Sequence, residues 1–207
     1  TGPKKLKLIA LATDSKLSVS SDVHAVATTI AAGAELHFTH ATAAAANGII
    51  TTAGTTGKIN VGTATVTIAG AVDLGASGTL KVTIGDTNGQ LVATASNITT
   101  HGDTLVEPTI AGRITSGTQI RIADDSTTDL VIPTVAVSES YERYTFTVEG
   151  CVGSATTNLC LTPTLVTPAG VTGAGAAVNA VADIAFAADA TMNDAIQGLT
   201  GAVLQKA

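Results

Sequence analysis

Short segments in which threonine alternates with an aliphatic residue most constrain the fold of this chain. Residues 63–68 have the sequence TATVTI, and residues 79–84 have the sequence TLKVTI. Strict alternation is typical of β-strands that bury one face. Asn88 and Gly89 lie between residues 79–84 and residues 90–93, and an Asn-Gly pair supplies the positive φ angles of a tight hairpin. The sequence therefore predicts antiparallel strands, with a hairpin turn at 85–89.

The rest of the chain follows the same pattern. Further strands are predicted at 103–107, 111–115, 118–123, 129–137, 143–150 and 159–166. Helix signals are few: residues 41–46 and 192–199 favour short helices, and residues 21–32 fit a helix or a strand. No repeat of fixed length is visible. Many short strands predict one all-β domain over residues 1–207, an antiparallel β-sandwich of jelly-roll or immunoglobulin-like topology with one or two short helices. Prolines and glycines predict an irregular loop at 162–177.

Composition indicates how such a domain is held together. Hydrophobic residues make up 45% of the chain but aromatic residues only 2%, so the core must consist of small and branched aliphatic side chains. Charged residues are 13%, about half the usual share of roughly 25%. A weakly charged surface loses little hydration when two faces pack together. This composition suits thin, closely packed sheets and a chain that completes its burial by assembling with its own copies.

Charge and hydropathy bear on partners and location. The net charge is −6 and the chain has ten Lys and Arg residues in total. Nucleic acid is not an expected partner, because binding phosphates needs clustered cations. No run reaches the ~18 apolar residues of a membrane helix. The chain begins at Thr1 and contains two cysteines, so we expect a secreted protein at the cell surface, released by signal-peptide cleavage.

Cys151 and Cys160 flank a turn between two predicted strands. A hairpin would place their Cα atoms at about 4.5–5.5 Å, inside the range for a disulfide. Closing a loop of ~10 residues is worth roughly 2.7 kcal/mol in the chain-entropy model. The prediction is a disulfide. Two buried thiols and a metal-binding pair are the alternatives, and the latter lacks matching histidines.

Residues for catalysis or metal binding are sparse. No nucleophile elbow or zinc-protease motif occurs, so we expect no enzyme activity, no catalytic residues and no cofactor. His37 and His40 are three residues apart, which puts them on opposite faces of a strand. Two groups of oxygen-bearing residues are compatible with Ca²⁺, but turn chemistry is the preferred interpretation for both: Asp86 with Asn88, and Asp124, Asp125 and Asp129. Asn97 begins a glycosylation sequon, and surface glycans are an optional partner.

The function expected from these features is structural. We expect a subunit of an extracellular, pilus-like filament in which a strand of one copy completes the sheet of the next copy. The candidate donor strand is the alternating N-terminal segment within residues 1–15, formed by Lys4, Lys5, Leu6, Lys7, Leu8, Ile9, Ala10, Leu11 and Ala12. An ordinary first strand of the same domain explains this segment equally well. The alternative function is a non-enzymatic surface module, such as an adhesin, a surface-layer protein or a capsid-decoration protein.

Overall fold

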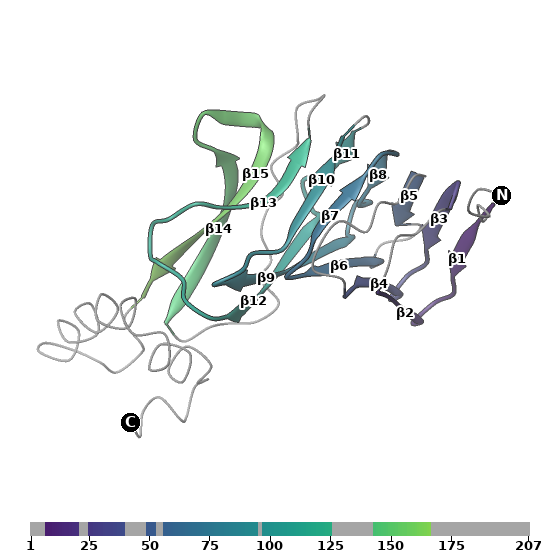
Figure 1. The fold of residues 1–207 in the computed structure, drawn as a ribbon, viewed down its shortest axis with the longest axis horizontal. Coiled ribbons are helices and arrows are strands. Elements are labelled where there is room, and N and C mark those ends of the chain that lie inside the picture. The colour runs from purple at the N-terminus through teal and green to yellow at the C-terminus, as the bar shows by residue number, and fades with distance from the viewer. Residues whose placement is uncertain are drawn as a thin grey trace, which may run out of the picture.

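A computed structural model describes residues 7–20, 25–39, 49–52, 56–94, 97–125 and 143–166. These residues form fifteen strands and no helix. The fold is an all-β, mostly parallel β-solenoid of about four turns, extended by a small mixed sheet. The strands of successive turns stack side by side from the N-terminal end toward the β14–β15 hairpin (Figure 1).

Three sheets form the walls of the solenoid. The first sheet is parallel and has the order β1 (Ile9–Leu11), β3 (Ala27–Ile30), β5 (Ile49–Thr52), β8 (Val72–Asp73) and β11 (Ile98–Thr99). The second is also parallel and has the order β2 (Lys16–Val19), β4 (Glu35–Phe38), β6 (Lys58–Gly62), β9 (Thr79–Gly85) and β12 (Leu105–Ala111). The third contains the parallel strands β7 (Thr65–Ile68), β10 (Gln90–Ala93) and β13 (Ile120–Asp125), followed by the antiparallel strands β15 (Ser154–Leu165) and β14 (Tyr144–Cys151).

The core consists of ladders of aliphatic side chains that point into the solenoid. One ladder crosses the whole second sheet and contains Leu17, Leu36, Ile59, Leu80 and Val106. All of them except Leu17 are buried. Alternation within each strand turns every second residue outward, so the period-two pattern of the sequence appears as one apolar and one polar face. Stacked methyl and methylene groups thus make up most of the core, together with the rings of Phe38 and Tyr144.

The predicted antiparallel sandwich is wrong. Side chains alternate in the same way in parallel and antiparallel strands, so alternation could not distinguish the two. The repeat was not visible in the sequence because the coils differ in length. Positions that stack in the second sheet are Lys16, Glu35, Lys58, Thr79 and Leu105, so the coils take 19, 23, 21 and 26 residues. The corners between the strands differ in length, so the stacked positions do not recur at a fixed spacing in the sequence.

The predicted hairpin at 85–89 is wrong as well. Its two strands, β9 and β10, belong to the second and third sheets and do not pair with each other. Neither Asn88 nor Gly89 has a positive φ angle, so the turn is a corner of the solenoid. The Asn88 side-chain oxygen accepts a hydrogen bond from the Gly85 N–H at 2.9 Å, which holds the corner. Gly89 is required for another reason: a Cβ atom there would lie 1.9 Å from the Gly62 carbonyl oxygen of the previous coil.

Several predicted strands are confirmed with shifted ends. The segments at 103–107, 118–123, 143–150 and 159–166 correspond to β12, β13, β14 and β15. Residues 112–115 are not a strand, whereas β3 shows that part of 21–32 is one. Residues 162–165 of the predicted irregular loop end β15, and its residues 167–177 lie outside the described residues. The predicted strand at 129–137 and the helices at 41–46 and 192–199 also lie outside them.

Candidate assembly edge

The first coil of the solenoid has unpaired strand edges. Among the described strands, β1 pairs only with β3, and β2 pairs only with β4. The carbonyls of Ser15 and Val19 accept hydrogen bonds from the N–H groups of Glu35 and Thr39, at 2.8 Å each. In a parallel ladder alternate residues face opposite sides, so the backbone groups of Lys16 and Ser18 face away from β4. We call this outer side of β2 the first-coil edge.

Apolar side chains gather at the same end. Leu11, Leu17 and Val19 are only partly buried, although they pack against the core. Large hydrophobic side chains that are exposed among the described residues are few, and two of them lie beside the first coil: Leu8 and Val26, each 58% exposed. Backbone groups without sheet partners and half-covered aliphatic side chains together are the features that accept an additional strand.

The outer face of the second sheet carries a ladder of ion pairs. The Lys16 ammonium lies 2.9 Å from a Glu35 carboxylate oxygen, and the Lys81 ammonium lies 2.8 Å from Glu107 and 4.0 Å from Glu35. Burial tends to raise the pKa of Glu35, but hydrogen bonds from Lys16 and Asn60 and the charges of Lys16 and Lys81 lower it overall. Because Glu35 lies on β4, this ion pair draws the Lys16 side chain toward β4 and away from the first-coil edge.

The opposite end of the solenoid is built differently. The Leu105 N–H donates to the Gly78 carbonyl of the preceding corner at 2.9 Å, so odd-numbered residues of β12 face β9. Pro108 therefore has its nitrogen, which has no hydrogen, on the outer side of β12, where proline prevents a further strand from pairing. The third sheet ends in the antiparallel β14–β15 hairpin. Among the described strands, the second sheet thus has an unpaired edge at β2 and carries a proline on the outer side of β12.

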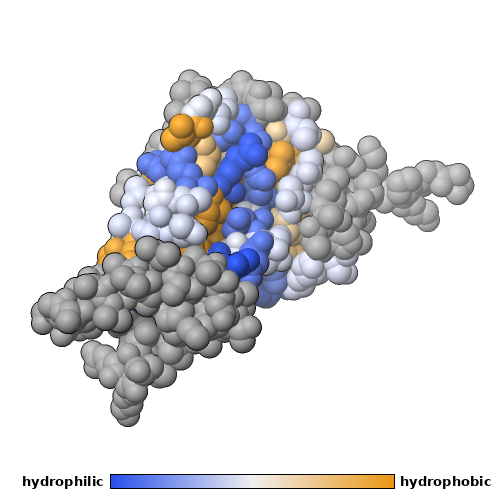
Figure 2. Space-filling model, turned by 60° about the vertical axis from the view of Figure 1, so that its left-hand side comes forward, coloured by the Kyte–Doolittle hydropathy of each residue, from blue (hydrophilic) through white to orange (hydrophobic). Residues whose placement is uncertain are grey.

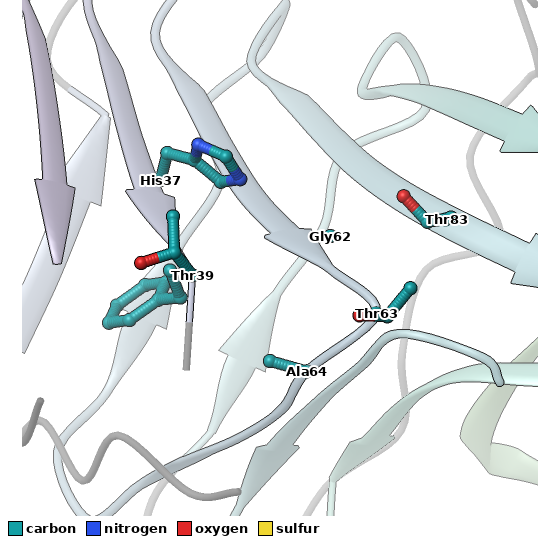
Figure 3. A pocket seen from close by; sticks show the side chains of 7 residues that line it. His37, Thr39, Gly62, Thr63, Ala64 and Thr83 are labelled. Atoms are coloured by element: carbon teal, nitrogen blue, oxygen red, sulfur yellow. The ribbon is translucent and has the colours of Figure 1, made fainter. Parts of the chain in front are cut away.

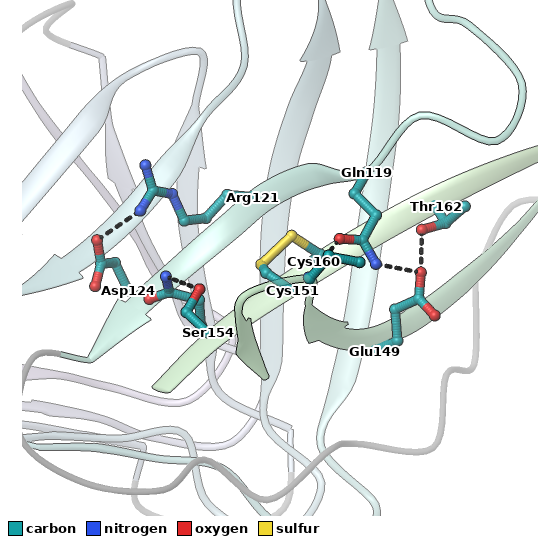
Figure 4. The surroundings of a disulfide bond; sticks show 10 residues. Gln119, Arg121, Asp124, Glu149, Cys151, Ser154, Cys160 and Thr162 are labelled. Atoms are coloured by element: carbon teal, nitrogen blue, oxygen red, sulfur yellow. Dashed lines mark hydrogen bonds and ion pairs between the residues drawn. A yellow bond between two sulfur atoms is a disulfide. The ribbon is translucent and has the colours of Figure 1, made fainter. Parts of the chain in front are cut away.

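The predicted disulfide is confirmed within this hairpin. Cys151 and Cys160 are bonded with a Cα–Cα distance of 5.1 Å, inside the predicted range (Figure 4). Gln119 joins the hairpin to the corner before β13: its amide donates to Glu149 and accepts from the Val152 N–H, at 2.8 Å each. The Thr162 hydroxyl also donates to Glu149, and these hydrogen bonds lower the pKa of the Glu149 carboxyl.

The candidate donor strand is only partly covered by the structure. Ile9, Ala10 and Leu11 form β1 and pair in parallel with β3 of the same chain. Ala12 ends the strand at a turn, where its carbonyl accepts a hydrogen bond from the Ser15 hydroxyl at 2.6 Å. Lys7 and Leu8 are exposed, and residues 4–6 lie outside the described residues. Donation of this segment to another copy stays a prediction.

A hollow of about 290 Å³ lies where the second sheet turns into the third (Figure 3). His37 and Thr83 project from β4 and β9, and Thr39, Thr63 and Ala64 belong to the adjacent corners. Burial lowers the pKa of His37, the charges of Lys16 and Lys81 lower it further, and Glu35 opposes them. Among the described lining residues His37 is the ionisable one, so they offer hydroxyls and a neutral imidazole to a ligand.

The oxygen-bearing residues considered for Ca²⁺ make separate contacts. Asp86 pairs with Arg113 at 3.0 Å, while Asn88 holds its own corner. Asp124 pairs with Arg121 at 3.1 Å, whereas the buried Asp125 accepts from the Ile98 N–H at 2.8 Å. Among the described residues no three His, Cys, Asp or Glu side chains are arranged for a metal ion.

Some residues considered for sites lie outside the described ranges or next to their ends. Asp129 and His40 lie outside the described residues. Asn97 is exposed and directly precedes β11, an accessible position for the sequon.

Comparison with family models, curated proteins and solved structures finds no match for this chain, so its function has to be inferred from its own residues. In the described part of the chain no helix has the length and hydropathy needed to span a bilayer. On the face drawn in Figure 2, a hydrophilic band runs beside pale and hydrophobic patches, which is a mixed surface.

Proposed function

We propose that the chain is a structural subunit of an extracellular filament and that copies associate through the first-coil edge. The observation that carries this proposal is the outward direction of the Lys16 and Ser18 backbone groups next to the half-buried Leu17 and Val19. A strand added there gains ladder hydrogen bonds and covers apolar surface. The disulfide supports an oxidising location outside the cytoplasm.

Two routes of strand addition are compatible with this edge. In the first, residues 4–12 of one copy leave their own sheet and pair with the next copy. In the second, β2 of one copy pairs with an edge strand of another copy, while β1 stays paired within its own chain. The second route leaves the pairing of Ile9–Leu11 with β3 intact. A variant that starts at Thr13 lacks the donor segment of the first route and keeps β2. Assembly of this variant would favour the second route, and loss of assembly would favour the first.

The experiment compares the full chain with Ser18→Pro by size-exclusion chromatography and negative-stain electron microscopy. The Ser18 N–H faces outward, so proline removes a donor that the chain itself does not use, as Pro108 does in β12. Ser18→Thr is the matched control because it keeps the N–H group. We expect oligomers or filaments from the full chain and from Ser18→Thr, and monomers of unchanged thermal stability from Ser18→Pro.

A full chain that stays monomeric at high concentration would refute self-assembly. The function would then be that of the surface module, an adhesin, surface-layer or capsid-decoration protein. The hollow beside His37 is the observation that favours this second candidate, because it is a concave site on the outer face of a rigid sheet. Binding of a glycan panel to the monomer, lost when Thr83→Trp fills the hollow, would support it.

A further inference from the structure

The two ends of the solenoid differ in a way that limits how two copies can pair. Pro108 disfavours strand addition on the outer side of β12, so a first-coil edge cannot continue the second sheet onto β12 of another copy. The other terminal strand of the second sheet is β2, so the partner considered for a first-coil edge is the first-coil edge of a second copy. Two identical edges that meet are related by a twofold axis, and strands related in this way run antiparallel.

We infer that two copies of this chain dock head to head through β2, with Ser18 opposite the partner's Ser18. This inference rests on the proposed self-assembly and names its partner and its register. Ser18 directs its backbone N–H and carbonyl outward, so the two Ser18 residues form an antiparallel hydrogen-bonded pair that exchanges two hydrogen bonds. Even-numbered residues, whose backbone groups face outward, then pair only with even-numbered residues.

Side-chain chemistry selects this register over its neighbours. Leu17 lies opposite the partner's Val19, and Val19 lies opposite the partner's Leu17. Both half-buried core residues of each copy are therefore covered. Lys16 lies opposite the partner's Ser20, and its ammonium is already held by Glu35 at 2.9 Å. A shift that centres the pairing on Lys16 would place two ammonium groups opposite each other, which is destabilising. A shift centred on Leu17 leaves Val19 opposite the partner's Ser15.

The docked pair extends the solenoid core through the interface. The ladder that ends at Leu17 continues into the inward-facing residues of the partner, since residues 17 and 19 point into the solenoid in both copies. A twofold contact closes on itself, so the dimer becomes the repeating unit and a filament needs a second contact. Val152, which lies between β14 and β15 and is 87% exposed, is an exposed large hydrophobic residue in the described part of the hairpin.

Cysteine cross-linking tests the register directly. Cys151 and Cys160 are bonded to each other, so an added cysteine supplies the free thiol. A hydrogen-bonded antiparallel pair has Cα atoms about 5.5 Å apart, within disulfide range. With diamide as the oxidant, we expect Ser18→Cys to give a covalent dimer at micromolar protein. Thr109→Cys, an exposed residue of the blocked strand β12, is the matched control and should stay monomeric on a non-reducing gel.

The outcomes separate the register from the proposed function. A dimer from Ser18→Cys alone supports the twofold docking. Oligomers in chromatography without a Ser18→Cys cross-link would overturn the register while self-assembly stands. A cross-link of equal yield in Ser18→Cys and Thr109→Cys would also overturn it, because collision would then account for both. A monomeric chain without cross-links would end both the inference and the proposed filament.

Discussion

Substituting Gly89 with alanine tests the solenoid itself. Gly89 is buried at the corner between β9 and β10, and its N–H donates to the Thr83 carbonyl at 2.8 Å. A Cβ atom would lie 1.9 Å from the Gly62 carbonyl oxygen, which belongs to the previous coil. The closest common C···O approach is roughly 3.3 Å, so the two coils would have to separate by more than an ångström.

The expected cost follows from this geometry. Overpacking a filled site costs about 1–3 kcal/mol, and the upper end applies because backbone of two coils has to move and no flexible side chain can give way. We expect Gly89→Ala to lose about 3 kcal/mol of the free energy of unfolding. At 2–4 °C per kcal/mol for a chain of about this size, Tm should fall by about 6–12 °C. Calorimetry or thermal unfolding followed by circular dichroism measures this shift.

Gly102→Ala is the matched control. Gly102 is exposed, and a Cβ atom there meets nothing within 4 Å. Alanine should be neutral or gain about 0.4–1 kcal/mol by restricting the unfolded chain. If Gly89 instead belonged to a hairpin tip, it would not touch Gly62 and both variants would behave alike. Equal Tm shifts for Gly89→Ala and Gly102→Ala would therefore refute the coil stacking.

Three further predictions concern the hairpin, the core and the titration of the outer face. Replacing both Cys151 and Cys160 with serine should lower the free energy of unfolding by about 2.7 kcal/mol, the chain-entropy value for a loop of ~10 residues, in urea titrations without reductant. Leu80→Ala, in the centre of a buried ladder, should cost about 2–5 kcal/mol in the same assay, whereas Thr109→Ala should stay within about 0.5 kcal/mol. Burial lowers the pKa of His37 below its ordinary value of 6.5, so the unfolded chain binds the proton more readily. Stability should thus fall as the pH drops through 6.5 toward the folded pKa, and His37→Gln should lose this component of a Tm-against-pH profile.

Local geometry was predictable from the sequence. The spacing of Cys151 and Cys160 within two alternating segments predicted a hairpin and a disulfide, and both are present. Most of the strands in the described ranges were also predicted, because alternation reports one buried and one exposed face. These features depend on residues close together in the chain. The expected absence of enzyme activity, the filament and the donor strand stay predictions.

Topology was not predictable in the same way. The sequence around Asn88 and Gly89 satisfies the rule for a tight hairpin, yet Gly89 is needed because Gly62 lies against it, 27 residues earlier. Coils of unequal length also conceal the stacking of Lys16 on Glu35 and of Glu35 on Lys58. Period-two alternation sets the direction of each side chain, but it carries no information about which strands become neighbours.

The candidate assembly edge shows the same limit most clearly. Leu17, Leu36 and Leu80 occupy equivalent positions in alternating strands, and nothing in their local sequence distinguishes them. Leu36 and Leu80 are buried because coils cover them on both sides, whereas Leu17 is half-buried because no described coil precedes it. Its exposure is therefore a property of its place in the stack. The proposed pairing of two first-coil edges would turn Leu17 into a core residue without any change in its own strand.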